Sequence, residues 1–297
     1  MQPEVLDGFC GSVGNTPLIR IPSLSEKTGC DVLGKAEFLN PGGSIKDRAA
    51  LWMVNAALAS GKLTAPGGLI IEATAGNTGV GLAHVCRAKG LRCQFVCPDH
   101  VSDEKVAHLK LLGAEDVVRV PRLPPSDPNN YQQLAKRMAQ EMGGVNLDQY
   151  HNLDNMQAHV ESTGPEIWKQ TGGQVHGLVL APGTGGTIAG CSTYLKQQDP
   201  AIQVYMLDIP GSGVVIHDHS VSEAELDAQN ARYTPSIRER LASEREDVST
   251  VMEGIGSNII YGNLSRSQID GLFKIPDECG VQMCHYLLKH GRLLSLL

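Results

Sequence analysis

The chain lacks the features that would place it in several specialised classes of protein. Only 4% of its 297 residues are aromatic, and no uninterrupted apolar run approaches the roughly 20 residues that cross a membrane. The net charge of -7 gives no basic surface for nucleic acid or an anionic membrane. Residues 1–11 have neither the basic start nor the apolar core of a secretory signal. We therefore expect a cytosolic protein with no nucleic-acid and no membrane partner, and the sequence leaves an organellar address open.

The sequence also lacks the paired cysteines of a metal or redox site. None of its eight cysteines forms a CxxC pair, and they are scattered through apolar segments, which is typical of reduced core thiols. In the polar stretch 211–245, His217 and His219 flank Asp218, but no third ligand follows at a usable spacing. We expect no metal centre, and a mobile, solvated surface segment in that stretch.

Helix-like and strand-like patterns alternate along the chain. The predicted helices are 47–60, 77–89, 103–112, 130–142, 155–170, 187–198 and 277–290, and the predicted strands are 69–73, 91–97, 117–120, 175–181 and 202–208. Strands separated by helices of this length cannot form hairpins, so the sheets should be mostly parallel with helices on their faces. The sequence therefore predicts two α/β domains, with ligands at the carboxyl ends of the strands.

A lysine stands where a glycine turn runs into an apolar helix. Lys46 follows Pro41-Gly42-Gly43 and opens the helix predicted at 47–60. The positive end of a helix disfavours an ammonium, so the pKa of this amine should fall and the amine should react more readily with an aldehyde. The alternative is a solvated lysine whose charge Asp47 offsets, and residues 40–48 alone leave both interpretations open.

Two glycine-containing loops each follow an apolar strand and precede a helix. In the loop 182–187, backbone N–H groups and two hydroxyls could bind a phosphate; its residues are Gly183, Thr184, Gly185, Gly186 and Thr187. In the loop 74–79, the hydroxyls of Thr74 and Thr78 could hold a carboxylate and Asn77 could donate to a ring oxygen. A structural turn and a simple helix cap are the alternatives. Together with the amine, the loops indicate an aldehyde cofactor with a phosphate tail that reacts with an amino acid.

Six segments in order carry a resemblance to a known family. Segments 14–18, 40–48, 74–79, 163–168, 183–187 and 253–256 match signatures of the cysteine synthase and cystathionine β-synthase family. The resemblance covers about residues 8–290 and is strongest to O-acetylserine sulfhydrylase-like proteins of the cysteine synthase 2 group. It implies pyridoxal 5'-phosphate (PLP), the tryptophan synthase β-like fold (fold type II) and a homodimer. It also implies a smaller, mobile substrate domain at 43–150 and a larger cofactor domain made of 1–42 plus 151–297.

The resemblance also implies a role for each matching residue. Lys46 would carry the cofactor and move the α-proton, Asn77 would contact the cofactor ring oxygen, and residues 183–187 would wrap its phosphate. The residues expected to bind or line the substrate site are Thr74, Ala75, Gly76, Thr78, Gln149 and Gly254. The implied reaction is β-replacement, in which sulfide displaces acetate from O-acetylserine and yields cysteine.

The sequence departs from the family pattern at two places. Ala75 stands where many members have serine, which removes one hydroxyl from the substrate loop. After the helix predicted at 277–290, residues 291–297 replace a longer terminal region, so Ser295 is a poor match for the serine that meets the pyridine nitrogen. From this shortening we expect a large domain that is incomplete at its end, with impaired folding or weak activity.

Three functions therefore remain open at this point. The favoured one is cysteine synthesis from O-acetylserine and sulfide. The second is a related PLP enzyme, either a serine or threonine dehydratase or a cystathionine β-synthase-like enzyme. The third is a catalytically impaired relative with a binding role.

Overall fold

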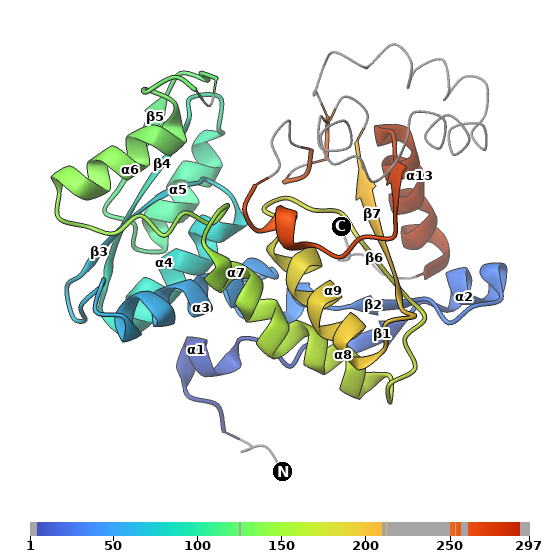
Figure 1. Cartoon of the computed structure of the whole chain (residues 1–297). Helices are drawn as coiled ribbons and strands as arrows, with labels where there is room; N and C mark the ends of the chain where they lie inside the picture. Colours follow the sequence, from blue (N-terminus) through green and yellow to red (C-terminus); the bar gives the residue numbers. More distant parts are fainter. Residues whose placement is uncertain are drawn as a thin grey trace. The chain divides into compact units, whose positions relative to one another are not determined.

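The computed structural model describes residues 5–124, 126–209, 212, 250–252, 254–256 and 261–291 (Figure 1). The chain divides into two compact units: unit 1 comprises Met1–Thr16 and Glu37–Ala158, and unit 2 comprises Pro17–Ala36 and His159–Leu297. The range 43–150, for which we predicted a mobile substrate domain, lies wholly within unit 1. The mobility and the division of roles between the two domains stay predictions.

Unit 1 is built on a parallel sheet with the strand order β3-β4-β5. The strands are β3 (Leu69–Ala73), β4 (Arg92–Pro98) and β5 (Asp116–Val120), and the helices are α1 (Gly8–Ser12), α3 (Lys46–Ala59), α4 (Asn77–Lys89), α5 (Asp103–Leu111), α6 (Tyr131–Glu141) and α7 (Leu153–Ala158), with a 3-10 turn η1 at Glu37–Leu39. Every residue of β3 is buried, including Glu72, as expected for a strand covered on both faces.

Helices cover both faces of this sheet, so unit 1 has three layers. On one face, Ile70 and Phe95 join a cluster with residues of α3, α4 and α5. On the other face, Ile71 and Val96 pack against Ala135 and other residues of α6. Successive side chains of a strand point to opposite faces, which is why neighbouring residues of β3 enter different clusters.

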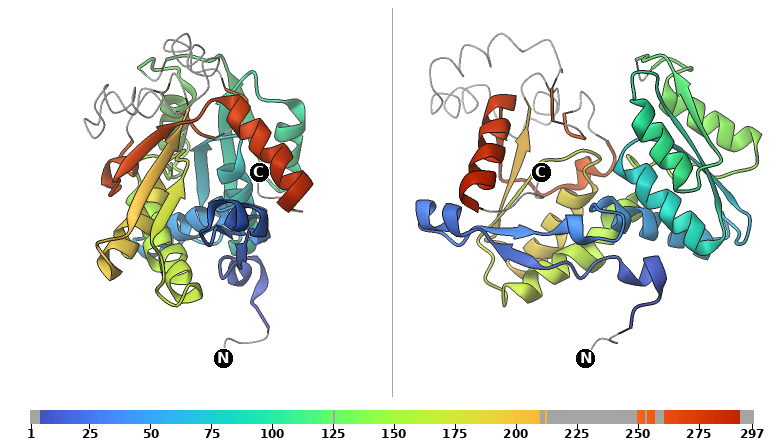
Figure 2. Two further views of the ribbon diagram at one scale, coloured as in Figure 1. Left: turned by 90° about the vertical axis from the view of Figure 1, so that its right-hand side faces the viewer. Right: turned by 180° about the vertical axis from the view of Figure 1, so that it is seen from behind.

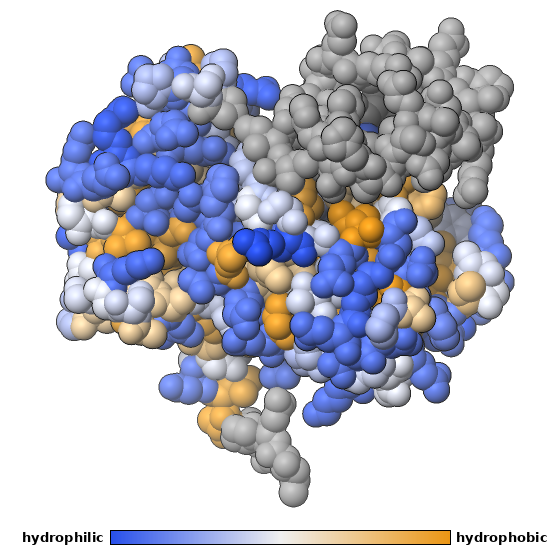
Figure 3. Space-filling model, in the orientation of Figure 1, coloured by the Kyte–Doolittle hydropathy of each residue, from blue (hydrophilic) through white to orange (hydrophobic). Residues whose placement is uncertain are grey.

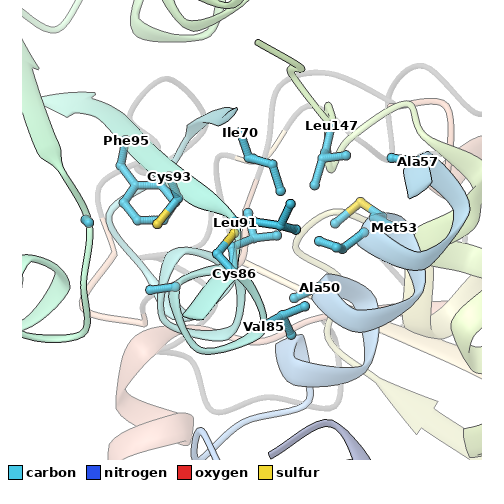
Figure 4. Close-up of a cluster of buried hydrophobic side chains, with 14 of the residues drawn as sticks. Ala50, Met53, Ala57, Ile70, Val85, Cys86, Leu91, Cys93, Phe95 and Leu147 are labelled. Carbon is cyan, nitrogen blue, oxygen red and sulfur yellow. The ribbon is translucent and has the colours of Figure 1, made fainter. Parts of the chain in front are cut away.

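The larger cluster of unit 1 joins the lysine-bearing helix to the sheet. Figure 4 shows Met53 of α3 and Cys86 of α4 directed toward Ile70 of β3, and all three side chains are 0–1% exposed. Burying one such side chain contributes about 1.5–3 kcal/mol. Because these contacts run along α3, the cluster holds this helix, whose first residue is Lys46, against the sheet.

Unit 2 contains an antiparallel pair and a second parallel sheet. The pair is β1 (Leu18–Arg20) with β2 (Leu33–Lys35), and the sheet has the order β6 (Gly177–Leu180), β7 (Gln203–Asp208), β8 (Gly271–Lys274). The helices are α2 (Pro22–Thr28), α8 (Gly164–Gln170), α9 (Gly186–Gln198) and α13 (Asp277–Tyr286), with π turns η2 (His159–Thr163) and η4 (Leu287–Gly291) and a 3-10 turn η3 (Leu264–Arg266). Helix α13 runs beside this sheet in Figures 1 and 2.

The observed elements follow most of the predicted ones. Strand β3 and helix α4 have the predicted bounds, and both sheets of three strands are parallel. The helix predicted at 155–170 is interrupted by the π turn His159–Thr163. Strands β1, β2 and β8 were not predicted, because strands of three or four residues carry too little periodic pattern to recognise.

The surface of the described residues carries apolar side chains in small groups. On the face drawn in Figure 3 the coloured residues are mostly hydrophilic, with apolar residues between them. Scattered apolar residues of this kind are normal on a protein surface. Among the described residues, no helix is both long enough and apolar enough to traverse a bilayer.

Candidate functional site

Lys46 is the first residue of α3 and follows a tight glycine turn. Gly43 has a φ of 86° and donates its N–H to the Asn40 carbonyl over 2.8 Å, and the Lys46 N–H donates to Ser44 Oγ over 3.2 Å. Within the described part of the chain, the Lys46 amine has neither a hydrogen bond nor an ion pair. Burial lowers the pKa of this amine below its ordinary value. The direction of the pKa change is the predicted one, and desolvation is its cause.

Asp47 does not offset the charge of Lys46. Its side chain is fully buried, and Oδ2 accepts the Gly42 N–H over 2.6 Å, so the carboxylate closes the glycine turn. The other oxygen, Oδ1, has no hydrogen-bond partner. Burial raises the pKa of Asp47 to about 6, and the charge of Glu37 acts in the same direction. The alternative of a solvated lysine whose charge Asp47 offsets is therefore wrong in the role that it gives to Asp47.

A buried ion pair fixes the first turn of the lysine helix. Arg48 is fully buried, and its Nε and Nη2 donate to the two carboxylate oxygens of Glu37, each over 2.8 Å. The same carboxylate accepts from Thr16 Oγ1 over 2.6 Å and from Asn40 Nδ2 over 2.7 Å. The network joins Thr16 of the 14–18 motif to Asn40 and Arg48 of the 40–48 motif through Glu37.

The loop 74–79 connects β3 to α4 and presents both buried and exposed groups. Thr74 and Thr78 are buried, whereas Gly76 and Asn77 are exposed. Thr78 Oγ1 donates to the side-chain oxygen of Gln149 over 2.6 Å, although 71 residues separate them in the sequence. The structure therefore brings together two predicted carboxylate-binding residues. The Asn77 side chain has no partner among the described residues, so it can bind a ligand.

In unit 2, the loop 183–187 connects β6 to the first turn of α9. Gly185 has a φ of 86°, and a Cβ there would lie 2.5 Å from backbone atoms of Leu264. A Cβ on Gly183 would collide with the carbonyl oxygen of Gly254, so these two predicted site residues are in contact. Only glycine fits both positions. The loop therefore follows a tight path into α9. The first N–H groups of this helix have no partner within the helix and can bind an anion at the loop.

A histidine that the sequence analysis missed holds the end of this loop. His159 is 1% exposed; its Nε2 lies 3.3 Å from Thr187 Oγ1 and its Nδ1 lies 2.9 Å from Thr163 Oγ1. Both contacts are hydrogen bonds of a buried ring. The signal in the sequence was the spacing of four between His159 and Thr163 inside a predicted helix, but nothing local pointed to Thr187.

The structure places the predicted site residues in two groups. Unit 1 holds Lys46, Thr74, Ala75, Gly76, Asn77, Thr78 and Gln149, and unit 2 holds Gly183, Thr184, Gly185, Gly186, Thr187 and Gly254. The stretch with His217, Asp218 and His219, and also Ser295, lie outside the described residues.

Comparisons with known proteins agree on one family. The profile of the family "Pyridoxal-phosphate dependent enzyme" matches residues 10–296. The chain is 43% identical to "Cysteine synthase 1" of Neurospora crassa over 288 residues, which are 96% of this chain and 71% of that protein. It is 39% identical to "Cysteine synthase 2" of Schizosaccharomyces pombe over 307 residues, covering 99% of this chain and 74% of that protein. These matches confirm the predicted resemblance.

A solved structure confirms the fold class. The O-acetylserine dependent cystathionine beta-synthase from Helicobacter pylori superimposes with a TM-score of 0.80 at 28% identity, covering 98% of this chain and 86% of that chain. The α/β architecture with parallel sheets is therefore that of fold type II PLP enzymes.

Proposed function

Because the chain belongs to the family of pyridoxal-phosphate dependent enzymes, we propose that it makes cysteine from O-acetylserine and sulfide. Its cofactor is PLP. Relatives named cysteine synthase that are about 40% identical over nearly the whole chain support this reaction. In the reaction, the Cβ–O bond breaks, acetate leaves with its electron pair, and sulfide forms the new Cβ–S bond.

The residues of the chain fit the chemical groups of PLP. The aldehyde requires an amine, and Lys46 offers one that has no competing partner in the described residues. The phosphate requires converging N–H donors, and the glycine loop 183–187 leads directly into the first turn of α9, along a path on which a Cβ at Gly183 or Gly185 would collide with Gly254 or Leu264. We propose that Lys46 holds the cofactor, that residues 183–187 bind its phosphate, and that Asn77 donates to its ring oxygen.

We propose that the substrate carboxylate binds to the loop 74–79 together with Gln149. The hydroxyls of Thr74 and Thr78 and the backbone of Ala75 and Gly76 lie at the start of α4, where the helix dipole favours an anion. Gln149 is tied to Thr78, so the amide and the hydroxyl are held together. We propose that Gly254 of unit 2 is a further substrate-lining residue, as the family resemblance implies.

In the proposed chemical step, Lys46 carries the proton. When bound, PLP withdraws electrons from the substrate and acidifies the proton on Cα. Lys46 removes that proton as a general base, and its lowered pKa raises the fraction of free amine near neutral pH. Asn77 orients the cofactor, and the loop 74–79 orients the substrate.

The observation that carries this proposal is the partly buried Lys46 amine at the start of α3, which has no hydrogen-bond or ion-pair partner among the described residues. Borohydride reduction of the PLP-loaded protein followed by peptide mass mapping should find the pyridoxyl group on Lys46. The Lys46→Ala variant should lose the visible absorbance of the bound cofactor and should form no cysteine. An unmodified Lys46 in cofactor-saturated protein would refute the assignment.

One observation supports homocysteine as an alternative to sulfide as the thiol substrate. The H. pylori enzyme with a TM-score of 0.80 is an O-acetylserine dependent cystathionine beta-synthase, so this fold also serves a larger thiol acceptor. Assays with O-acetylserine plus either sulfide or homocysteine should favour sulfide. Release of pyruvate from serine without any acceptor would indicate a dehydratase instead, and a folded, colourless protein that takes up no PLP would indicate a binding role.

We also propose a homodimer in the cytosol, because the family resemblance implies dimers that pair through the cofactor domain. Light scattering on purified protein and cell fractionation test the two statements separately.

A further inference from the structure

Glu72 is a buried carboxylate that the proposed chemistry does not use. It lies on β3, two residues before Thr74, and only 1% of its surface is exposed. A parallel strand covered on both faces normally carries apolar side chains, as the neighbouring residues Ile70 and Ile71 of β3 do. A carboxylate at this position must therefore be held by specific hydrogen bonds.

Three consecutive backbone N–H groups donate to this carboxylate. Leu147 and Asp148 donate to Oε2 over 3.1 and 3.0 Å, and Gln149 donates to Oε1 over 3.1 Å. The Asn146 side chain adds a donor 3.3 Å from Oε2. Asp148 has a φ of 53°, a strained conformation for a residue other than glycine. The Glu72 carboxylate thus stabilises a turn that the residues 146–149 would not favour by themselves.

The last residue of this turn is Gln149, whose side chain reaches back to the substrate loop. Its Nε2 donates to the Ala73 carbonyl over 3.3 Å, and its Oε1 accepts from Thr78 over 2.6 Å. The backbone N–H of Gln149 is held by Glu72 at the same time. Hydrogen bonds therefore connect Glu72 to the backbone of Gln149, and the side chain of Gln149 to Ala73 and Thr78.

We propose that Glu72 is a positioning residue for the amino-acid substrate, which holds Gln149 against Thr78 and thereby fixes the loop 74–79 that binds the substrate carboxylate. The inference rests on the proposed function, because it takes the loop 74–79 and Gln149 as the carboxylate site. Glu72 touches neither the cofactor nor the reacting atoms, so it should affect substrate binding more than the chemical step.

The role depends on the charge of Glu72, because an ionised carboxylate only accepts hydrogen bonds and each group around it is a donor. Burial, assisted by the charge of Asp148, raises the pKa of Glu72 to about 7. Asp148 is itself paired with Lys136 of α6 and with His151, over 2.7 and 3.1 Å. As the pH falls through about 7, Glu72 becomes neutral and one of its oxygens becomes a donor. The turn should then loosen and the KM for the amino-acid substrate should rise.

The variant Glu72→Gln tests the proposal, because it keeps the shape and replaces an acceptor by a donor. Near pH 8 we expect the KM for O-acetylserine to rise about tenfold, with kcat within about twofold of wild type and unchanged PLP absorbance. The ratio of the two KM values should approach one near pH 6, where the wild-type side chain is neutral as well. The matched control is Glu115→Gln, which removes a carboxylate paired with Arg92 and remote from the loop, and it should leave KM unchanged.

A measurement on the apoprotein does not depend on activity. Hydrogen exchange of the Leu147, Asp148 and Gln149 amides should accelerate in Glu72→Gln, while the amides of β4 stay protected. If the glutamine variant does not fold, Glu72→Asp, which keeps the charge but withdraws it by one methylene group, replaces it in both assays.

The outcomes separate the proposal from the proposed function. An inactive wild-type protein refutes the proposed function, and a Gln149→Ala variant with unchanged KM refutes the assignment of the substrate site. The role of Glu72 is overturned if the wild type is active and Gln149→Ala raises KM, but Glu72→Gln changes neither KM nor hydrogen exchange. A parallel loss of kcat, PLP binding and β4 protection in Glu72→Gln would also overturn it, because that pattern is structural.

Discussion

The buried ion pair between Arg48 and Glu37 should make a large contribution to the stability of unit 1. The Arg48 side chain is 0% exposed and that of Glu37 is 14% exposed, and the pair has two hydrogen bonds of 2.8 Å. In Glu37→Gln the guanidinium stays buried without a counter-charge. Breaking one side of a buried pair costs about 3–5 kcal/mol, and the partial exposure of Glu37 places the expected loss near the lower end of that range.

The assay is urea unfolding followed by the fluorescence of a single tryptophan. The chain has two tryptophans, Trp52 packed against the core of unit 1 and Trp168 in unit 2. A Trp168→Phe background therefore leaves a reporter for unit 1 alone. In this background Glu37→Gln should lower the free energy of unfolding by about 3 kcal/mol.

The control is an exposed pair in the same unit. Lys110 and Asp116 lie 3.5 Å apart with side chains 52% and 54% exposed, so Lys110→Met should cost less than about 1 kcal/mol. The double variant of Glu37→Gln and Arg48→Met should lose less than the sum of the single losses, because the second change removes the uncompensated charge. Equal losses for Glu37→Gln and Lys110→Met, or strict additivity in the double variant, would refute the reasoning.

Three further variants test the site. Gly185→Ala should weaken PLP binding at least about tenfold in an absorbance titration, because Gly185 has a φ of 86° and a Cβ there would meet the backbone of Leu264. The control is Gly172→Ala, where φ is 61° and no atom lies near the added Cβ; this variant should bind PLP normally. His159→Phe should raise the Kd for PLP about fivefold through loss of its hydrogen bond to Thr187, and an unaltered titration would show that this contact is unimportant. An amine whose pKa is lowered on folding destabilises the folded state at every pH below its ordinary pKa, so Lys46→Met should stabilise the apoprotein at neutral pH. Urea denaturation that shows a loss of stability would contradict this.

The local sequence was sufficient for the elements with a strong pattern. Strand β3 is apolar except for Glu72, and α4 ends at Gly90, whose φ of 67° closes the helix, so both had the predicted bounds. The short strands β1, β2 and β8 are defined by pairing partners rather than by their own residues, and they were missed. The π turn at His159–Thr163 was missed for a similar reason, since its histidine is held by Thr187 in another helix.

The sequence by itself determined the residue types of the proposed site: one lysine at a helix start, a glycine loop after a strand, and a threonine-containing loop after another strand. These depend on residue type and on neighbours within a few positions, which a linear pattern contains. Only the tertiary structure decided that Asp47 closes a turn instead of pairing with Lys46, and that Arg48 is buried against Glu37. It also decided that Glu72 supports the turn carrying Gln149. These contacts join residues that are far apart in the chain or depend on burial, and both are set by how the elements pack.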